Sequence, residues 1–255
     1  FTNGSAAGSK YAARTNMGDK PVNYVSWFDA ARVANWLHNG GLTYGTTGTS
    51  ASAPQNTGAY TLGIATSGTA FTRNSGAQYY IPTENEWYKA AYYKGSGTNA
   101  GYWDYPTQSD TAPTEVTSGS TGIGSASTGT IGSGTGNFAN FNSSADWNGQ
   151  DGHVTTVGTN GGPSAYGAFD MGGNVWEWNE TLIGSSRGLR GGYWNNGAFN
   201  LSSSNRFEAG PSNEIDGIGF RLASPVAVPE PSTWVMGLAG IACAGWGTYR
   251  RRRAR

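Results

Sequence analysis

The sequence predicts a loop-rich domain with a few short helices and strands. It contains 41 glycines in 255 residues, and only 13% of its residues are charged. It also contains 10 tryptophans and 14 tyrosines, which need a core in which to be buried. Helix-rich proteins do not have this composition, whereas irregular folds that pack aromatic side chains beneath loops do. The length fits one large domain, or one domain with appendages.

Charge and cysteine content exclude several classes of protein. The formal net charge is zero, so there is no electrostatic case for a nucleic-acid partner. The single cysteine, Cys243, lies in an apolar C-terminal segment, which excludes an intrachain disulfide and a cysteine-based zinc site. His38 and His153 are the only histidines, and they leave little material for a multi-histidine metal site. The chain begins at Phe1 rather than Met, which indicates a fragment or a processed form.

Capping residues predict two helices. Ser26 is a good N-cap for a helix over residues 27–38, in which apolar residues recur at helical spacing. Residues 83–86, Thr-Glu-Asn-Glu, form a capping box that begins a second helix. The two glutamates of this box could act as an acid/base pair. Their place in the first helical turn instead favours roles in capping and in the helix dipole.

Short strands are predicted between loops. Residues 21–26 alternate like a short strand, residues 79–82 read as a strand end, and residues 217–222 read as the closing strand. The insertion after the first helix contains one hairpin that brings residues 60–62 near residues 70–72.

The segment 168–178 combines glycines, an asparagine and two tryptophans around a carboxylate. Asp170 and Glu177 are hard oxygen donors, and a backbone bent at glycines can turn carbonyls toward the same point, as calcium requires. Trp176 and Trp178 lie on one face if the segment is extended. The alternative is a glycine-rich turn between two buried tryptophans, with Glu177 paired to a nearby arginine. From these residues alone, that alternative is favoured.

Further oxygen donors gather between Asn137 and His153. The pattern Asp146-x-Asn148-x-Gln150 resembles the start of a calcium loop. It departs from the EF-hand pattern, because the glycine comes one place late and no glutamate closes the loop. A calcium-binding turn of another type remains an alternative interpretation.

Five motifs occur in a fixed order along residues 21–223. They are Val22-x-x-Val25-Ser26-Trp27-x-x-Ala30, Ile81-Pro82-Thr83-Glu84-x-Glu86-Trp87, Gly173-Asn174-Val175-Trp176-Glu177-Trp178, Arg190-Gly191-Gly192-Tyr193-Trp194 and Ile218-Gly219-Phe220-Arg221. Together they resemble the formylglycine-generating-enzyme, or sulfatase-modifying-factor, domain family. The resemblance implies an α+β, C-type-lectin-like fold with little regular secondary structure. The opening segment of the family is not visible in this sequence.

The resemblance also implies two structural calcium sites. The first would use the side chain of Asn140, the carbonyl of Phe141, the side chain of Asp151 and the carbonyl of His153. The second would use the side chain of Asp170, the carbonyls of Gly173 and Val175, and the side chain of Glu177. All four side-chain positions carry oxygen donors, so the resemblance reverses the preference for a plain turn.

The catalytic cysteines of the family have no counterpart here. The copper oxidase uses two cysteines after its Gly-Gly-Ser segment, and the corresponding positions are Asn196 and Leu201. Neither residue can ligate Cu(I), which prefers sulfur. A related branch uses non-haem iron with histidines supplied largely by another domain. We therefore expect calcium without copper or iron, and no formylglycine-generating activity. The alternative is an oxidoreductase of the same superfamily with a centre that the sequence does not reveal.

An aromatic and amide segment stands where the family has its ligand groove. It comprises Tyr193, Trp194, Asn195, Asn196, Phe199, Asn200, Ser202, Asn205 and Arg206. Such side chains suit a peptide or glycan ligand. Ordinary packing of the two aromatic residues, with the asparagines in polar turns, explains the segment equally well.

The C-terminal segment resembles a PEP-CTERM sorting signal. Its parts are a linker over residues 224–233 with the motif Pro229-Glu230-Pro231, an apolar helix over 234–249 and a basic tail over 250–255. The helix reaches ~24 Å, which is short for a permanent span of a ~30 Å hydrocarbon core. The arginines mark the cytoplasmic side. This resemblance implies a Gram-negative exported protein, a transmembrane inner-membrane intermediate and cleavage by an exosortase.

These observations predict one sulfatase-modifying-factor-like domain over residues 1–223, followed by the sorting segment. We expect a calcium-stabilised binding or extracellular-matrix protein that is exported to the cell surface or the matrix. Its expected partners are the exosortase, the inner membrane for a short time, and a glycan or peptide ligand.

Overall fold

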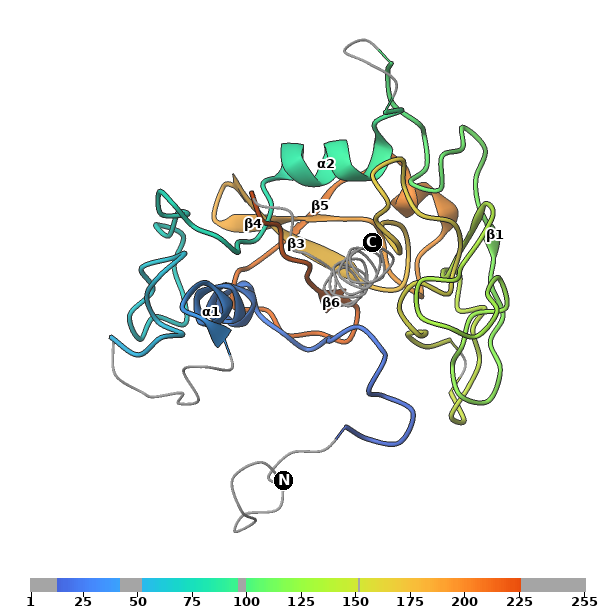
Figure 1. Ribbon diagram of the computed structural model, residues 1–255, viewed down its shortest axis with the longest axis horizontal. Helices are drawn as coiled ribbons and strands as arrows, with labels where there is room; N and C mark the ends of the chain where they lie inside the picture. Colours follow the sequence, from blue (N-terminus) through green and yellow to red (C-terminus); the bar gives the residue numbers. More distant parts are fainter. Residues whose placement is uncertain (1–12, 42–51, 96–99, 151, 226–255) are drawn as a thin grey trace, which may run out of the picture. The chain divides into compact units, whose positions relative to one another are not determined.

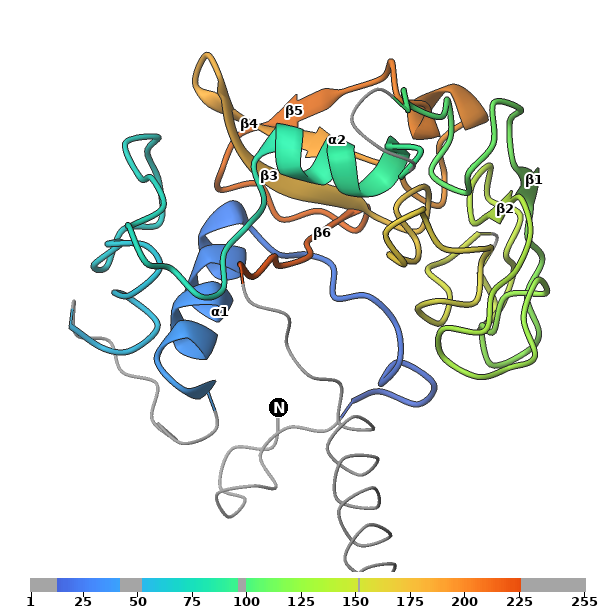
Figure 2. The same ribbon diagram turned by 45° about the horizontal axis from the view of Figure 1, so that its top comes forward.

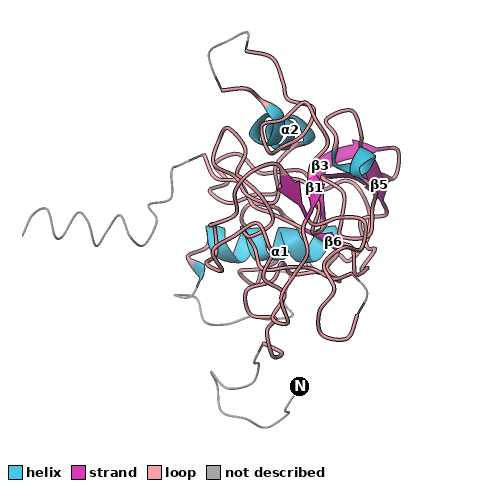
Figure 3. Cartoon of the chain, turned by 90° about the vertical axis from the view of Figure 1, so that its right-hand side faces the viewer, coloured by secondary structure: helices cyan, strands magenta, loops and turns pink. Residues whose placement is uncertain are grey.

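The computed structural model describes residues 13–41, 52–95, 100–150 and 152–225. The chain divides into two units, Phe1–Ala223 and Ser224–Arg255, and the elements below belong to the first. In chain order they are α1 (Trp27–His38), α2 (Glu84–Tyr92), β1 (Thr114–Glu115), β2 (Phe138–Ala139), β3 (Trp176–Ile183), β4 (Ser186–Arg190), the 3-10 helix η2 (Ala198–Leu201), β5 (Phe207–Ala209) and β6 (Ile218–Gly219) (Figure 1). Most of the described chain is loop, as the composition predicts (Figure 3).

Both predicted helices are present with their predicted caps. Ser26 accepts a bond from the backbone N–H of Asp29, and the Asp29 carboxylate accepts one from the Ser26 backbone, which begins α1 at Trp27. The same reciprocal pair between Thr83 and Glu86 begins α2. Because these bonds satisfy the free N–H groups of the first turn, each helix start is determined locally.

A four-stranded sheet has the order β5-β4-β3-β6. Strands β3 and β4 form an antiparallel pair with Trp178 opposite Leu189, and Leu189 lies opposite Phe207 on β5. Strand β6 pairs with β3 in parallel, with Ile218 opposite Trp176. The predicted closing strand is therefore confirmed, although it is shorter than predicted. Strands β1 and β2 form a separate parallel pair.

The two faces of this sheet carry different chemistry. Trp176, Trp178 and Leu189 belong to one face, and they share a buried core with Trp27 and Phe28 of α1. Their common face confirms the parity predicted for the two tryptophans. The opposite face carries charged residues and contacts α2. Figures 2 and 3 show α1 and α2 on opposite sides of the sheet.

Buried charges attach α2 to the sheet. Arg190 on β4 donates to the Glu84 carboxylate of α2, at 2.9 Å from Nε and 2.5 Å from Nη2. The indole Nε1 of Trp87 donates to Glu177 on β3 at 2.6 Å. Since each partner is buried, removal of either one would leave a charged or polar group without compensation.

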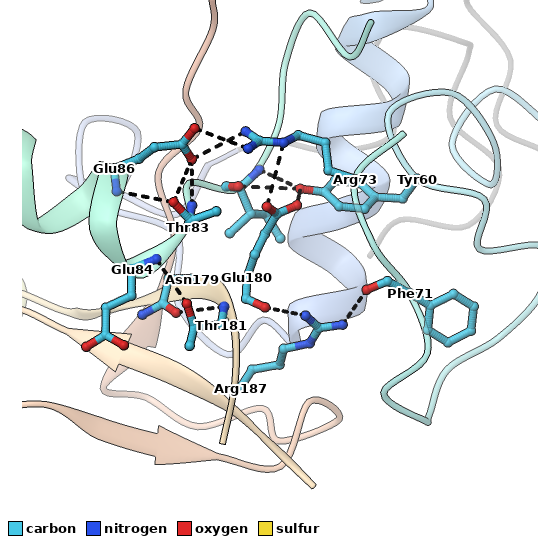
Figure 4. Close-up of polar contacts among 11 residues, drawn as sticks. Tyr60, Phe71, Arg73, Thr83, Glu84, Glu86, Asn179, Glu180, Thr181 and Arg187 are labelled. Carbon is cyan, nitrogen blue, oxygen red and sulfur yellow. Dashed lines mark hydrogen bonds and ion pairs between the residues drawn. The ribbon is translucent and has the colours of Figure 1, made fainter. Parts of the chain in front are cut away.

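A polar cluster attaches the segment after α1 to the end of β3 (Figure 4). The hydroxyl of Tyr60 donates to Glu180 at 2.6 Å and accepts from the backbone N–H of Ile81 at 2.9 Å. Arg73 approaches Glu180 at 3.7 Å, and it pairs with Glu86 at 3.1 Å. Tyr60 and Arg73 also form an antiparallel bridge, which lies one residue beyond the predicted arm 70–72. Residues 61–62 and 70–72 themselves take no strand or bridge pairing.

The prediction of a strand over residues 21–26 is wrong. No strand forms there, because Tyr24 has a left-handed backbone with φ of 55°. A tertiary bond holds this conformation, in which the Tyr24 N–H donates to the carbonyl of Ile215 at 3.1 Å. The prediction failed because the alternating pattern carries no information about that distant partner.

Candidate functional site

A pocket of about 590 Å³ lies against the sheet at the end where β5 forms an edge. All four strands of the sheet contribute to its lining. The residues that line it are Trp176, Ser186, Leu189, Tyr193, Asn196, Asn200, Phe207, Glu208, Ala209, Gly210, Asn213, Ile215, Gly217 and Ile218. We call it the sheet pocket. Its volume falls within the range of small-molecule sites.

Aromatic rings form one side of the sheet pocket. Phe207 stacks on Trp176 with ring centroids 5.8 Å apart and planes at 25°. Trp176 is 5% exposed and Phe207 is 55% exposed, so the buried ring supports a ring that faces the solvent. Tyr193 lies against Gly217, where a Cβ would come within 2.5 Å of the tyrosine ring. A ligand with an apolar face meets rigid, supported rings here.

Amide side chains supply the polar part of the lining, and they belong to Asn196, Asn200 and Asn213. The Glu208 carboxylate points to the opposite face of the sheet, because this residue pairs with Gly188 between Phe207 and Ala209. The side-chain oxygen of Asn196 accepts from the Tyr193 N–H at 3.2 Å, which fixes the orientation of that amide. None of the described lining residues is Lys or Arg. The sheet pocket therefore suits a neutral ligand that offers hydroxyl or amide groups.

The predicted groove residues do not all meet in one place. Tyr193, Asn196 and Asn200 line the sheet pocket, whereas Trp194 lines a second pocket beside it. The others lie outside both pockets. Asn195 accepts from the Ser143 hydroxyl, the Ser202 hydroxyl donates to the Phe199 carbonyl, and Phe199 itself is 66% exposed. The Asn205 carbonyl accepts from Arg190, and Arg206 approaches Glu84 at 3.7 Å. Residues 207–217, which supply much of the lining, were not predicted.

The positions that correspond to the copper ligands have different environments. Asn196 lines the sheet pocket, and Leu201 is fully buried in a cluster with Ala139 and Phe141. Cys243 lies outside the described residues. Among the described residues, no three His, Cys, Asp or Glu side chains gather in a group that could hold a metal.

The first predicted calcium set contains a buried oxygen with no partner. Asn140 is 0% exposed, and its Oδ1 has no hydrogen-bond partner among the described residues. Its Nδ2 donates to the carbonyl of His153 at 2.7 Å and to the Thr155 hydroxyl at 3.1 Å. The carbonyl of Phe141 accepts from Ser144, and Asp151 lies outside the described residues. A buried amide oxygen without a donor fits a calcium ligand.

In the second predicted set the side-chain oxygens already have partners. Asp170 accepts from the Gly158 N–H at 2.5 Å and from Asn160 Nδ2 at 3.1 Å, and burial raises the pKa of its carboxyl. Glu177 binds Arg221 through both oxygens, as the alternative reading of this segment anticipated.

A pocket of about 330 Å³ brings three members of the second set together. Asp170, Val175 and Glu177 line it together with Arg221, while Gly173 packs against Asn140. A calcium ion at this place would compete with Arg221 for the Glu177 carboxylate.

The Asp146 segment is a turn closed by the Asp146 side chain and by a backbone bridge. The Asp146 carboxylate accepts from the Gly152 N–H at 2.7 Å, and Trp147 pairs with Gln150 in an isolated bridge. These contacts account for the Asp-x-Asn-x-Gln pattern as a turn motif.

Comparison with known proteins identifies the class. Residues 3–226 match the family described as the sulfatase-modifying factor enzyme 1-like domain. The chain belongs to this family, as the ordered motifs predicted. No curated protein matches it.

Three solved structures are similar to this chain. A structure titled "Crystal Structure of CarF" has 22% sequence identity and a TM-score of 0.50, and the match covers 85% of this chain and 71% of that one. Variable protein 1 of Treponema denticola has 19% identity, a TM-score of 0.49 and coverages of 86% and 76%. PvdO from Pseudomonas aeruginosa has 19% identity, a TM-score of 0.44 and coverages of 82% and 63%. The fold is the predicted α+β sulfatase-modifying-factor fold.

The C-terminal segment carries a second match. Residues 227–253 match the PEP-CTERM protein-sorting motif, which indicates export to the cell surface and processing by an exosortase. The motif residues Pro229, Glu230 and Pro231 and the predicted span 234–249 lie outside the described residues. Within the described ranges, no helix has the length and apolar character to cross a membrane.

Proposed function

We propose that the protein is an exported, calcium-stabilised binding protein that holds a glycan or peptide ligand in the sheet pocket. The single observation that carries the proposal is the supported aromatic wall beside the oriented amide of Asn196. Phe207 is exposed although it is a large apolar residue, and the buried Trp176 holds its ring in place. Exposed, rigid aromatic rings beside amides are typical of recognition surfaces.

The chemistry at the same place favours binding over oxidation. The family's copper oxidase needs two sulfur ligands, and Asn196 and Leu201 supply none. The first ligand position carries the amide of Asn196, which lines the sheet pocket, and the second carries the buried aliphatic side chain of Leu201. Asn196 therefore offers a hydrogen-bonding amide to a ligand, whereas Leu201 packs in the core.

Calcium has a structural role in this proposal. The orphaned Asn140 Oδ1 would be a ligand of the first site, together with the backbone carbonyls of Phe141 and His153 and the side chain of Asp151. The ion would join the segment around residue 140 to the segment around residue 153, and so stabilise loops that have little regular structure.

The sorting motif supports the proposed location. We propose that the chain passes through an inner-membrane intermediate, and that exosortase cleavage near Pro229-Glu230-Pro231 releases the domain to the cell surface or the extracellular matrix. A binding domain without its membrane segment is suited to contact surface polymers there.

The test is a binding screen with the full chain in detergent, against an array of glycans and a library of peptides. We expect a glycan or a peptide to bind, and we expect Phe207→Ala to remove that binding. Tyr166→Ala is the matched control, because Tyr166 is 53% exposed and stacks on Tyr93 at 27°, outside both pockets. Binding that survives Phe207→Ala would contradict the assignment to the sheet pocket.

A second assay tests the exclusion of oxidase chemistry. The chain is incubated with a cysteine-containing sulfatase peptide, oxygen and copper, and the peptide is analysed by mass spectrometry. We expect no aldehyde product. Clear conversion to formylglycine would overturn the proposal in favour of an oxidoreductase.

A further inference from the structure

A second pocket, of about 420 Å³, shares a wall with the sheet pocket. Consecutive residues of this wall belong to alternate pockets. Tyr193 lines the sheet pocket and Trp194 lines the second. Ile215 and Gly217 line the sheet pocket, and Asp216 between them lines the second. Because successive side chains of an extended segment point to opposite sides, the wall separates the two pockets, and a ligand that occupies both has to pass over its edge. We call the second space the tyrosine pocket, after Tyr24.

The shared wall is tightly packed. Gly217 leaves no room for a side chain against the ring of Tyr193, and its carbonyl accepts from the Trp176 N–H at 2.8 Å. Tyr193 and Trp194 meet edge to face with centroids 5.5 Å apart. Each ring therefore presents a fixed surface to its own pocket, and a ligand does not have to order these rings.

Tyr24 presents an exposed ring from a constrained backbone. Its side chain is 62% exposed, although its φ of 55° is uncommon for a bulky residue. Two bonds hold the segment against the wall. The Tyr24 N–H donates to the Ile215 carbonyl at 3.1 Å, and Asn23 Nδ2 donates to the Asp216 carbonyl at 2.8 Å. Backbone conformations of this kind occur preferentially at binding and active sites.

We propose that the sheet pocket and the tyrosine pocket are adjacent subsites for a single neutral polysaccharide chain. This inference rests on the proposed function and names its ligand class. Each pocket combines aromatic rings with amides, and the tyrosine pocket has Tyr24 and Trp194 beside Asn23, Asn148 and Gln150. Such rings cover the apolar faces of sugar rings, and the amides bond their hydroxyls.

The charges of both linings favour a neutral chain over a polyanion. The sheet pocket has no basic side chain among its described lining residues, and the Glu208 carboxylate points to the opposite face of the sheet. In the tyrosine pocket, Arg14 is balanced by Asp216. A polyanion would meet no net positive charge in either subsite, so recognition rests on stacking and on neutral hydrogen bonds.

Two linked subsites predict that affinity depends on the length of the ligand. A disaccharide occupies one subsite, whereas a longer chain occupies both and gains from the high effective concentration of its second half. Affinity should therefore rise by about a hundredfold between the shortest and the longest ligand. A single subsite gives no such rise once it is filled.

The experiment measures binding of the full chain in detergent to neutral oligosaccharides, from disaccharides to octasaccharides of the cello, xylo, laminari and chito series. Variants Trp194→Ala and Tyr24→Asn remove one ring each from the tyrosine pocket, and asparagine tolerates the left-handed backbone at residue 24. We expect each to weaken octasaccharide binding by about tenfold and to leave disaccharide binding unchanged. Phe207→Ala should remove both octasaccharide and disaccharide binding, and Tyr166→Ala should change neither.

The possible outcomes separate the two proposals. Length-independent binding that requires Phe207 but not Trp194 or Tyr24 would overturn the second subsite and leave the proposed function intact. Binding of a peptide, with no oligosaccharide bound, would overturn the polysaccharide and likewise leave the proposed function intact. The absence of binding to every oligosaccharide and every library peptide would overturn both.

Discussion

Arg221 binds the Glu177 carboxylate with two nitrogens, Nε at 2.5 Å and Nη2 at 2.6 Å. The same Nη2 donates to the carbonyls of Phe169 and Asp170, so the pair joins β3 to the loop that precedes it. Trp87 of α2 adds a third donor to the carboxylate. One carboxylate thus connects the sheet, a loop and a helix.

Glu177→Ala should lower the free energy of unfolding by about 3 kcal/mol. The substitution leaves the Arg221 guanidinium and the Trp87 N–H without their buried acceptor. The value is at the low end for buried pairs, because the Arg221 side chain is 28% exposed. Urea denaturation measures it, and a double-mutant cycle with Arg221→Met measures the coupling of the two residues. An unchanged midpoint in Glu177→Ala would contradict this role.

Removal of calcium should lower the melting temperature of the full chain. An ion present at 100 times its dissociation constant stabilises the folded state by about 2.7 kcal/mol. Differential scanning fluorimetry with and without EGTA measures the shift, and plasma mass spectrometry measures the bound metal. Asn140→Ala should abolish the response to EGTA, whereas Asn85→Ala, on the exposed side of α2, should retain it. Equal melting curves with and without EGTA in the parent chain would exclude the first site.

Gly173→Ala should cost more stability than Gly184→Ala. Both glycines have left-handed backbones, with φ of 77° and 61°, so both alanines are strained to a similar extent. At residue 173 the new Cβ would also lie 2.2 Å from the Asn140 carbonyl oxygen, whereas at residue 184 nothing lies within 4 Å. The extra cost should be about 1–3 kcal/mol, the range for overpacking. Thermal or urea unfolding of both variants gives the difference, and equal costs would refute the close contact.

The loss of unfolding free energy caused by Glu180→Gln should become smaller as the pH rises above 4.5. Burial raises the pKa of the Glu180 carboxyl above its ordinary value of 4.5, despite the Tyr60 hydroxyl and Arg73. In the window between 4.5 and the raised pKa, the folded state therefore binds more protons than the unfolded state, and this group's contribution to stability declines with rising pH. Glutamine does not titrate, so the variant lacks that decline. Urea titrations of both proteins at several pH values measure this loss of stability. A loss that increases with pH would contradict the raised pKa of the Glu180 carboxyl.

Elements with local causes could be predicted from the sequence. The starts of α1 and α2 depend on Ser26 and Thr83 and on acidic residues three positions later, and both were predicted correctly. The common face of Trp176 and Trp178 follows from strand geometry, and it too was correct. In each case the interacting groups are close in sequence, so the pattern contains the cause.

Features that depend on distant partners could not be predicted in this way. Tyr24 reads as a strand residue, but its bond to Ile215 places it in a left-handed conformation. Phe207 and Asn213 line the sheet pocket only because β5 pairs with β4 and directs the following loop across the sheet. No residue near them in sequence signals that arrangement. The alternation of Tyr193 and Trp194 between two pockets likewise depends on the wall from residues 215–217.

The residues that stabilise the sheet and the residues that line its pocket lie on different faces, so the pocket can be mutated without loss of the stabilising ion pairs. The ion pairs of Glu84 and Glu177 secure one face, while Phe207 and Asn213 expose their side chains at the other face and its edge. Changes at these two positions alter what the pocket contacts without unpairing a buried charge. A combinatorial library at them would therefore give mostly folded variants with new binding preferences, so the domain is a natural scaffold for engineered binders.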